Sequence, residues 1–253
     1  MENIKFLGQC GFWIKENNRS ILIDPVLTEL CEDGKSLMHY KPVMNPEDIE
    51  PDLVFCSHDH IDHLETETVK RIAKHSLKTT FVVPEGCEGI LNEAGITKDR
   101  YVLMADKSEK IFFDGEIIVK SFSTAHPVHH LDDEGKDRNL GYCLDFGDKK
   151  YVHVGDTYRT DRLFESMQAL GKIDLLFVPI NGRDEEREAR GIVGNLNAKQ
   201  AARLASDLDV KYVIPMHFDM MIGNTADPQD FVKAMKEMDP QIPYEIPVLY
   251  KAK

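Results

Sequence analysis

The sequence has no long apolar segment, no Cys-x-x-Cys pair and no N-terminal leader pattern. No apolar run reaches the roughly 18 residues that a transmembrane helix needs, which predicts that the protein has no membrane partner. The first residues lack a basic segment followed by a long apolar stretch, so no signal peptide is expected. The 5 cysteines form an odd set, which is typical of a reducing compartment rather than of a disulfide framework. These features predict a cytoplasmic location.

The sequence also lacks a net positive charge, spacers and repeats. A formal net charge of −13 offers no basic surface for a phosphate backbone, so no nucleic-acid partner is expected. No Gly/Ser-rich or Pro-rich spacer and no internal repeat divides the 253 residues. Because 42% of the residues are hydrophobic, the chain can bury a sizeable core. We therefore predict a single domain over residues 1–253.

The strongest local signal is a histidine-rich segment that directly follows a short apolar run. Such a run predicts a buried strand, which places the histidines on the loop at its end. Zinc, manganese and iron accept imidazole and carboxylate ligands. Residues two apart face the same side of an extended chain, so the segment predicts two adjacent metal sites; a solvated surface loop is the alternative. The four candidate ligands are His58, His60, Asp62 and His63.

Three later segments each end in a further candidate ligand. In each case an apolar, β-branched run that predicts a strand is followed by a histidine or an aspartate. These candidates are His126, Asp156 and His217. His129 and His130 lie close behind His126, so any one of the three could be the ligand, and we favour His126 because it lies nearest the strand end.

This pattern resembles the signature of the metallo-β-lactamase-fold hydrolases, in which later loops supply a His, an Asp and a second His. The resemblance implies an α/β fold, a four-layer αβ/βα sandwich, with the site at one edge between the sheets. It also implies one or two divalent metal ions, manganese or zinc, with iron as a third option. Mapped onto this family, His58, His60 and His126 hold the first metal, Asp62, His63 and His217 hold the second, and Asp156 bridges them.

A later segment resembles one branch of that family. The run Pro-Ile-Asn-Gly-Arg-Asp at residues 179–184, the arginines after it and the Pro-x-His-Phe-Asp around His217 are similar to the L-ascorbate-6-phosphate lactonases, which are substantially longer chains. Guanidinium groups bind phosphate bidentately, so the arginines are candidate anchors for a sugar-acid phosphate; an exposed segment whose arginines pair with neighbouring glutamates is the alternative. The candidate substrate-binding residues are Asn181, Arg183, Arg187, Arg190 and Asn195.

These observations lead to one main hypothesis and three alternatives. We predict metal-assisted hydrolysis of a small anionic substrate, most simply a phosphorylated sugar-acid lactone, with Asp62 or Asp156 as the catalytic proton acceptor. A phosphodiesterase on the same metal scaffold is the first alternative. A di-iron redox protein and a non-catalytic binding module are the others. A homo-oligomer is an open alternative to a monomer.

The remaining pattern alternates strands and helices, as expected for α/β layering. Helices are predicted over residues 65–75, 85–94, 198–207 and 230–238, a loop over 27–50 and an edge strand over 244–251. Asp24, before Pro25, is either a hydrogen-bond partner for a ligating histidine or a turn residue. His153 is expected to be a structural histidine, because it alternates with the inward-facing residues of its strand.

Overall fold

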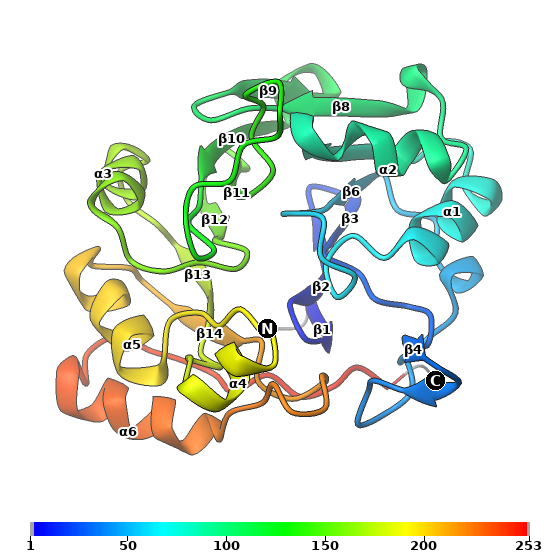
Figure 1. The fold of residues 1–253 in the computed structure, drawn as a ribbon. Helices are drawn as coiled ribbons and strands as arrows, with labels where there is room; N and C mark the ends of the chain where they lie inside the picture. Colours follow the sequence, from blue (N-terminus) through cyan, green and yellow to red (C-terminus); the bar gives the residue numbers. More distant parts are fainter. Residues whose placement is uncertain (1–2, 252–253) are drawn as a thin grey trace.

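Two six-stranded sheets face each other, and helices cover the outer face of each sheet (Figure 1). The structure is a computed structural model and describes residues 3–251. The arrangement is the predicted four-layer αβ/βα sandwich, so the predicted fold class is confirmed. Within residues 3–251, no helix is long and apolar enough to cross a membrane.

The first sheet comes from the N-terminal half of the chain. Its strands follow the order β1-β2-β3-β6-β7-β8; β1 to β3 pair antiparallel, and β3 to β8 pair parallel. Val69, Ile72 and Leu91 on its helices pack against Val54 and Phe81 of the sheet, because apolar residues recur on one face of each helix. The strands are β1 (Ile4–Gly8), β2 (Gly11–Glu16), β3 (Arg19–Ile23), β6 (Leu53–Phe55), β7 (Thr80–Pro84) and β8 (Tyr101–Met104), and the helices are α1 (Thr66–His75) and α2 (Glu88–Glu93).

The second sheet comes from the C-terminal half and has the order β14-β13-β12-β11-β10-β9. Its first three strands pair parallel and the others antiparallel. Figure 1 shows its larger helices on the side away from the first sheet. The strands are β9 (Glu109–Phe112), β10 (Ile117–Ser123), β11 (Leu140–Asp145), β12 (Lys150–His153), β13 (Leu175–Pro179) and β14 (Val213–Met216), and the helices are α3 (Asp161–Ala169), α4 (Glu185–Ala189), α5 (Ala198–Asp207) and α6 (Pro228–Met238).

Aromatic side chains from both sheets fill the space between them. The rings of Phe12 and Phe177 have centroids 4.3 Å apart, and those of Phe55 and Tyr142 are 5.2 Å apart. The Tyr142 hydroxyl also donates a hydrogen bond of 2.9 Å to the carbonyl of Cys56, at the end of β6. Each buried aromatic of this kind contributes roughly 1.5–3 kcal/mol by leaving water. The core therefore fixes the ends of the strands from which the candidate ligands emerge.

The candidate ligands emerge at one edge of this core because the strands that precede them run in the same direction within each sheet. β10, β12 and β14 are mutually parallel, as the intervening pairings show, and the loops after them carry His126, Asp156 and His217. Loops at the carboxyl ends of parallel strands meet at one edge of a sheet, where ligands commonly bind. The loop after β6 approaches the same place from the opposite sheet: Leu140 donates its backbone N–H to the Ser57 carbonyl at 2.9 Å.

Some predicted elements differ from the structure. The predicted edge strand over residues 244–251 is wrong, since this tail makes only isolated bridges, between Phe6 and Leu249 and between Val213 and Tyr244. Pro247 has no N–H to donate and so interrupts a continuous ladder. The predicted loop over 27–50 contains a small hairpin, β4 (Cys31–Glu32) with β5 (Lys35–Ser36), and a 3-10 turn, η1 (Pro46–Asp48). The helix predicted from residue 85 begins as a 3-10 turn, η2 (Glu85–Cys87), and α6 begins two residues earlier than predicted. Two further 3-10 turns, η3 (Lys98–Arg100) and η4 (Phe113–Gly115), precede β8 and β10.

Candidate metal centre

The loop after β6 folds back on itself and brings its three histidines together. The backbone N–H groups of His63 and Leu64 both donate to the carbonyl of His60, at 3.0 and 2.9 Å. The His58 ring centroid consequently lies 4.5 Å from that of His60 and 4.1 Å from that of His63. His58 and His63 are buried, whereas His60 is exposed. The loop after β6 is therefore a compact turn in which one histidine is exposed, rather than the solvated surface loop of the alternative interpretation.

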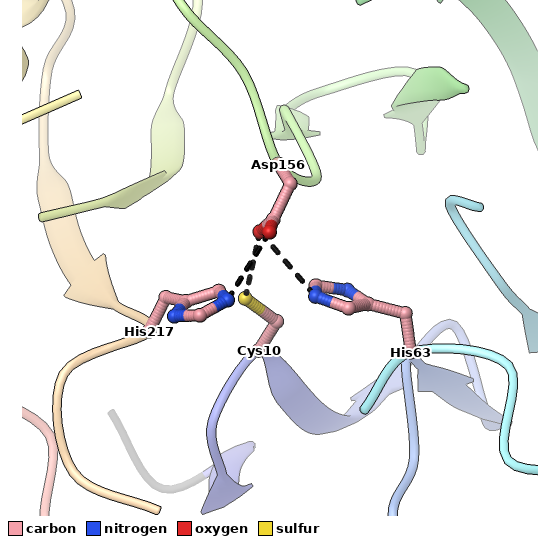
Figure 2. Close-up of side chains that lie close together, drawn as sticks. All are labelled: Cys10, His63, Asp156 and His217. Atoms are coloured by element: carbon pink, nitrogen blue, oxygen red, sulfur yellow. Dashed lines mark hydrogen bonds and ion pairs between the residues drawn. The ribbon is translucent and has the colours of Figure 1, made fainter. Parts of the chain in front are cut away.

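Two groups of potential metal ligands form around Asp156. Within each group, one side-chain atom from every member lies within 4.8 Å of the others. Asp156 belongs to both groups, which is the arrangement expected of a bridging carboxylate. Figure 2 shows the second group, in which Cys10, His63 and His217 all point toward Asp156. We call His58, His60, His126 and Asp156 the first donor group, and Cys10, His63, His217 and Asp156 the second donor group.

Three imidazole rings point a nitrogen at the Asp156 carboxylate. Its Oδ1 lies 3.3 Å from His63 Nε2, and its Oδ2 lies 3.4 Å from His126 Nε2 and 3.1 Å from His217 Nε2. Two ligands on one tetrahedral ion, each bonded at about 2.0 Å, are separated by about 3.3 Å. The observed separations therefore match the edges of a tetrahedral metal site.

Four buried nitrogens of these histidines make no hydrogen bond within residues 3–251. Nε2 of His58, Nε2 of His63 and both ring nitrogens of His126 have no hydrogen-bond partner among the described residues. A buried polar atom without a partner costs about 1–3 kcal/mol, and imidazole nitrogens are common metal ligands. These residues therefore fit a bound divalent cation.

A hydrogen-bonded support stands behind His63. Asp24 Oδ2 lies 2.7 Å from His63 Nδ1, while the Ser57 backbone N–H donates to Asp24 Oδ1 at 2.7 Å and the Ser57 hydroxyl to Oδ2 at 2.7 Å. This arrangement leaves His63 Nε2 directed toward Asp156. Of the two roles considered for Asp24, the structure shows the hydrogen-bond partner of a candidate ligand, His63. Such a contact fixes the orientation of the imidazole ring.

Asp62 flanks the second donor group without belonging to it. Its Oδ2 lies 3.7 Å from His63 Nε2 and 3.5 Å from His217 Nε2, and it accepts a hydrogen bond of 2.6 Å from Gln9 Nε2. Its role as a ligand stays a prediction. Cys10 and Gln9, which the sequence patterns did not single out, lie in the tip between β1 and β2. In the sequence, these residues show only a turn pattern, Gly8-Gln9-Cys10-Gly11. Their contacts with Asp62 and Asp156 form only when the two sheets pack together.

Of the three neighbouring histidines, the structure places His126 in a donor group. His129 is directed elsewhere: its Nδ1 lies 2.9 Å from the Ser123 hydroxyl and its Nε2 3.3 Å from the Thr160 hydroxyl. His153 is a structural histidine, as expected. Its Nε2 lies 3.0 Å from the Cys10 carbonyl, and its Nδ1 accepts a hydrogen bond of 3.2 Å from the Gly155 N–H. These contacts define a neutral ring with the proton on Nε2.

Comparison with known proteins assigns the family. Residues 19–218 match the family described as the beta-lactamase superfamily domain. The chain belongs to this superfamily. It is similar to the UPF0173 metal-dependent hydrolase of Thermococcus onnurineus, with 29% identity over 92% of this chain and 92% of the relative. A relative of the same name from Carboxydothermus hydrogenoformans is 29% identical over 90% of this chain and 89% of its own.

A solved structure shows the same fold. The metallo hydrolase Igni18 from Ignicoccus hospitalis aligns with a TM-score of 0.73 at 18% identity, covering 99% of this chain and 98% of that protein. With the donor groups, the sequence relatives support a metal-dependent hydrolase of the beta-lactamase superfamily that uses a divalent metal. Nothing in these likenesses selects the lactonase branch, which stays a prediction, as do the identity of the metal and the cytoplasmic location.

The two donor groups of this superfamily member differ in electrostatics. Burial lowers the pKa of His58 well below its usual value and that of His126 to about 4. Burial also acts to lower the pKa of His63, but the carboxylates of Asp156, Asp62 and Asp24 outweigh it and raise that pKa well above the usual value. In the metal-free protein, His58 and His126 of the first donor group are thus neutral, whereas the second donor group favours a cation.

A cavity of about 340 Å³ lies beside the first donor group. Arg138 lines it with His60 and His126, and the Arg138 guanidinium forms an ion pair with Asp59. Sequence reasoning missed Arg138, because the chain between His126 and β11 gave no periodic pattern. The lining residues are Asp59, His60, His126, Pro127, His130, Arg138, Asn139 and Val193.

The predicted substrate-binding residues separate into an internal network and two surface arginines. The Asn195 amide donates to Asn181 Oδ1 at 3.1 Å, and Asn181 donates to Asn224 at 3.0 Å. Arg187 joins them by donating to the Asn181 carbonyl at 2.8 Å, and it also donates to Asp184 at 2.6 Å.

Arg183 and Arg190 are placed differently. The Arg183 guanidinium lies over the Tyr158 ring, 4.9 Å from its centroid, and both residues line a cavity of about 330 Å³. This cavity shares Pro127 with the cavity beside the first donor group. Arg190 packs over Gly223, where an added Cβ would lie 2.8 Å from its guanidinium. A substrate-binding role for all five residues stays a prediction, and Arg183 is the one that lines a cavity sharing residues with that of the first donor group.

Proposed function

We propose that this protein is a dinuclear metal-dependent hydrolase that opens a cyclic ester of a small anionic substrate, namely a phosphorylated sugar-acid lactone. The observation that carries the proposal is the sharing of Asp156 by two donor groups, in which four buried nitrogens of His58, His63 and His126 make no hydrogen bond to the described residues. A cavity with a cationic side chain adjoins the first donor group. The similarity to metal-dependent hydrolases of nearly the same length supports the same reaction class.

In this proposal the two donor groups hold divalent cations. When bound, such cations lower the pKa of water toward neutrality and polarise the carbonyl of an ester. His58, His60 and His126 would hold one cation and His63 and His217 the other, and Asp156 would contribute to both sites. Both zinc and manganese accept this mixture of nitrogen and oxygen ligands.

Asp62 is the proposed proton acceptor. Its side chain is 13% exposed, more than the 3% of Asp156, and its Oδ2 faces His63 and His217. Burial acts to raise the pKa of Asp62, but His63 and His217 outweigh it, so the pKa is lowered and the carboxylate is ionised at neutral pH. Gln9 holds the same oxygen through its amide, which orients the carboxylate. Asp62 can therefore accept the proton from an attacking water at Oδ2.

Two arginines are the proposed contacts for the substrate phosphate. Arg138 is 41% exposed at its side chain and lines the cavity with His60. Arg183 lines the adjoining cavity next to Tyr158. The chain as a whole carries a net charge of −13, so local cations are required to attract an anion. Guanidinium groups bind phosphate through paired N–H donors, which favours a phosphorylated substrate over a neutral one.

The test compares two substrate classes on the zinc-loaded and manganese-loaded protein. We expect hydrolysis of phosphorylated sugar-acid lactones to exceed that of their unphosphorylated counterparts and that of bis-p-nitrophenyl phosphate. His60→Ala, which removes an exposed donor without disturbing the core, should abolish the activity and identify any contaminating hydrolase. Turnover confined to the phosphodiester would replace the lactonase proposal with the phosphodiesterase alternative. A metal-loaded protein that hydrolyses neither class would overturn the proposal.

A further inference from the structure

Cys10 lies where a fourth ligand of the second donor group belongs. Its side chain is fully buried, and its Sγ lies 3.9 Å from Asp156 Oδ1 (Figure 2). It also lies within 4.8 Å of a ring nitrogen of His63 and of His217. For bonds of about 2.3 Å to sulfur and 2.0 Å to oxygen, a tetrahedral ion separates the two ligands by about 3.5 Å. The 3.9 Å between Cys10 Sγ and Asp156 Oδ1 exceeds this separation by only a few tenths of an ångström.

The backbone around Cys10 is held from three sides. Gly8, with φ +102°, and Gln9, with φ +56°, form the tight turn that directs the Cys10 side chain inward. The His153 ring donates to the Cys10 carbonyl at 3.0 Å and accepts from the Gly155 N–H at 3.2 Å. One buried ring thus ties the backbone of Cys10 to the residue before Asp156. The His217 N–H donates to the Gln9 carbonyl at 2.8 Å, which fixes the third ligand to the same turn.

Other buried cysteines do not share this setting. Of the cysteines within residues 3–251, Cys10 alone belongs to a donor group. Cys143 is buried in β11, and Cys87 Sγ faces the Arg138 carbonyl at 3.7 Å. The Cys10 sulfur instead points at a carboxylate and two imidazoles. This convergence of donor atoms distinguishes it from a packing cysteine.

We propose that Cys10 supplies a thiolate ligand to the divalent cation of the second donor group, together with His63, His217 and Asp156. The inference deepens the proposed hydrolase, because it assigns a ligand and a metal preference to one half of the same centre. Thiolate ligands select zinc, or a similar borderline cation, over manganese. The second donor group is therefore a zinc-selective site, and the thiol proton is released to solvent when the cation binds.

Cobalt(II) provides the direct test, because a thiolate bound to it absorbs in the near ultraviolet. We expect the full-length protein to take up about two cobalt equivalents and to develop this charge-transfer band. Cys10→Ala should lack the band and bind the second cobalt at least about tenfold more weakly. Cys143→Ala is the matched control, since it removes a buried cysteine outside both donor groups and should keep the band. X-ray absorption of the zinc-loaded wild type, which needs no variant, should show a sulfur neighbour at about 2.3 Å.

The outcomes separate this inference from the proposed function. Two bound cobalt ions without the band, or a Cys10→Ala variant that keeps it, would overturn the thiolate assignment and leave the hydrolase intact. A zinc-loaded wild type without a sulfur neighbour would do the same. A wild type that binds neither cobalt nor zinc and hydrolyses no ester would overturn both.

Discussion

The first donor group opens onto a cavity, whereas the second donor group is enclosed by protein. His60 in the first is exposed and lines the cavity with Arg138. In the second, His63 is fully buried, with Asp24 hydrogen-bonded behind it and Cys10 beside it. The histidine pKa values also shift in opposite directions in the two groups: burial lowers the pKa of His126, while three carboxylates raise that of His63.

This contrast indicates that the two donor groups contribute differently, the first to turnover and the second to stability and metal retention. Substrate can reach the first donor group through the cavity, so substitutions there should act on turnover. The second donor group is part of the packed interior, so substitutions there should act on stability and on retention of the metal. Asp156 belongs to both groups, so its substitution should affect turnover, stability and retention of the metal.

Asp156→Asn should have the largest effect. The neutral amide removes the charge that both donor groups share, so hydrolysis should fall by at least about 10³-fold and the bound metal should be lost from both groups. Steady-state kinetics and metal analysis of the purified variant check this. Asp145→Asn is the control, because it changes a partly buried carboxylate at the end of β11 that pairs with Lys150. A variant that keeps its metal in either group would break the claim of a shared ligand.

His63→Ala and His60→Ala should differ in stability. Removing His63 leaves the buried Asp24 carboxylate without its imidazole partner, so the free energy of unfolding of the metal-free protein should fall by roughly 3 kcal/mol. Removing the exposed His60 should cost less than about 1 kcal/mol. Denaturant unfolding of both metal-free variants makes the comparison. Equal losses would contradict the division between an enclosed and an open half.

The pH dependence of stability should also differ between the halves. The pKa of His126 is about 4 in the folded protein, below its value in the unfolded chain, so the unfolded chain binds more protons between pH ~6.5 and ~4. Metal-free wild type should therefore lose stability as the pH falls through this window. His126→Gln should reduce that loss by roughly 2 kcal/mol.

His63 provides the opposite sign. Its pKa is raised in the folded protein, so its contribution to stability is present below the pKa of the unfolded chain and is lost as the pH rises toward the folded value. His63→Ala should therefore flatten the stability profile of the metal-free protein above pH ~6.5. Unfolding curves measured across this pH range distinguish the two variants, and identical profiles would contradict the electrostatic contrast.

Arg138→Gln should have the smallest effect, confined to the open half. Loss of the guanidinium beside the cavity should raise KM for an anionic lactone by about tenfold and change kcat little, because the group contacts the substrate away from the reacting bond. Arg159→Gln is a suitable control, since its guanidinium pairs with Asp207 outside both cavities. An unchanged KM would remove Arg138 from the substrate contacts.

The ligands that the sequence predicted share one property: each follows a strand, so local pattern and strand direction suffice to bring them together. His58, His126, Asp156 and His217 are of this kind. Cys10 and Arg138 are not. Cys10 and Asp156 are 146 residues apart in the sequence and come into contact because one sheet packs on the other. No local sequence pattern predicts that contact. A turn residue and a loop arginine gain their chemistry only from the assembled fold.

The segment after β13 shows a second limit. Its arginines suggested a phosphate site, yet Arg187 donates to the Asp184 carboxylate and the Asn181 carbonyl within its own segment. Both roles use the same planar fork of donors, so residue type alone cannot separate them. The edge strand predicted for residues 244–251 is absent for a simpler reason, because Pro247 has no N–H to donate to a continuous ladder.

Anomalous X-ray diffraction from crystals of the metal-loaded protein tests the central claim most directly. Two divalent cations sharing Asp156 should produce two anomalous peaks, one among His58, His60 and His126 and one among Cys10, His63 and His217, with the Asp156 carboxylate between them. Crystals loaded with zinc and with manganese that show no peak beside Asp156 would contradict the account.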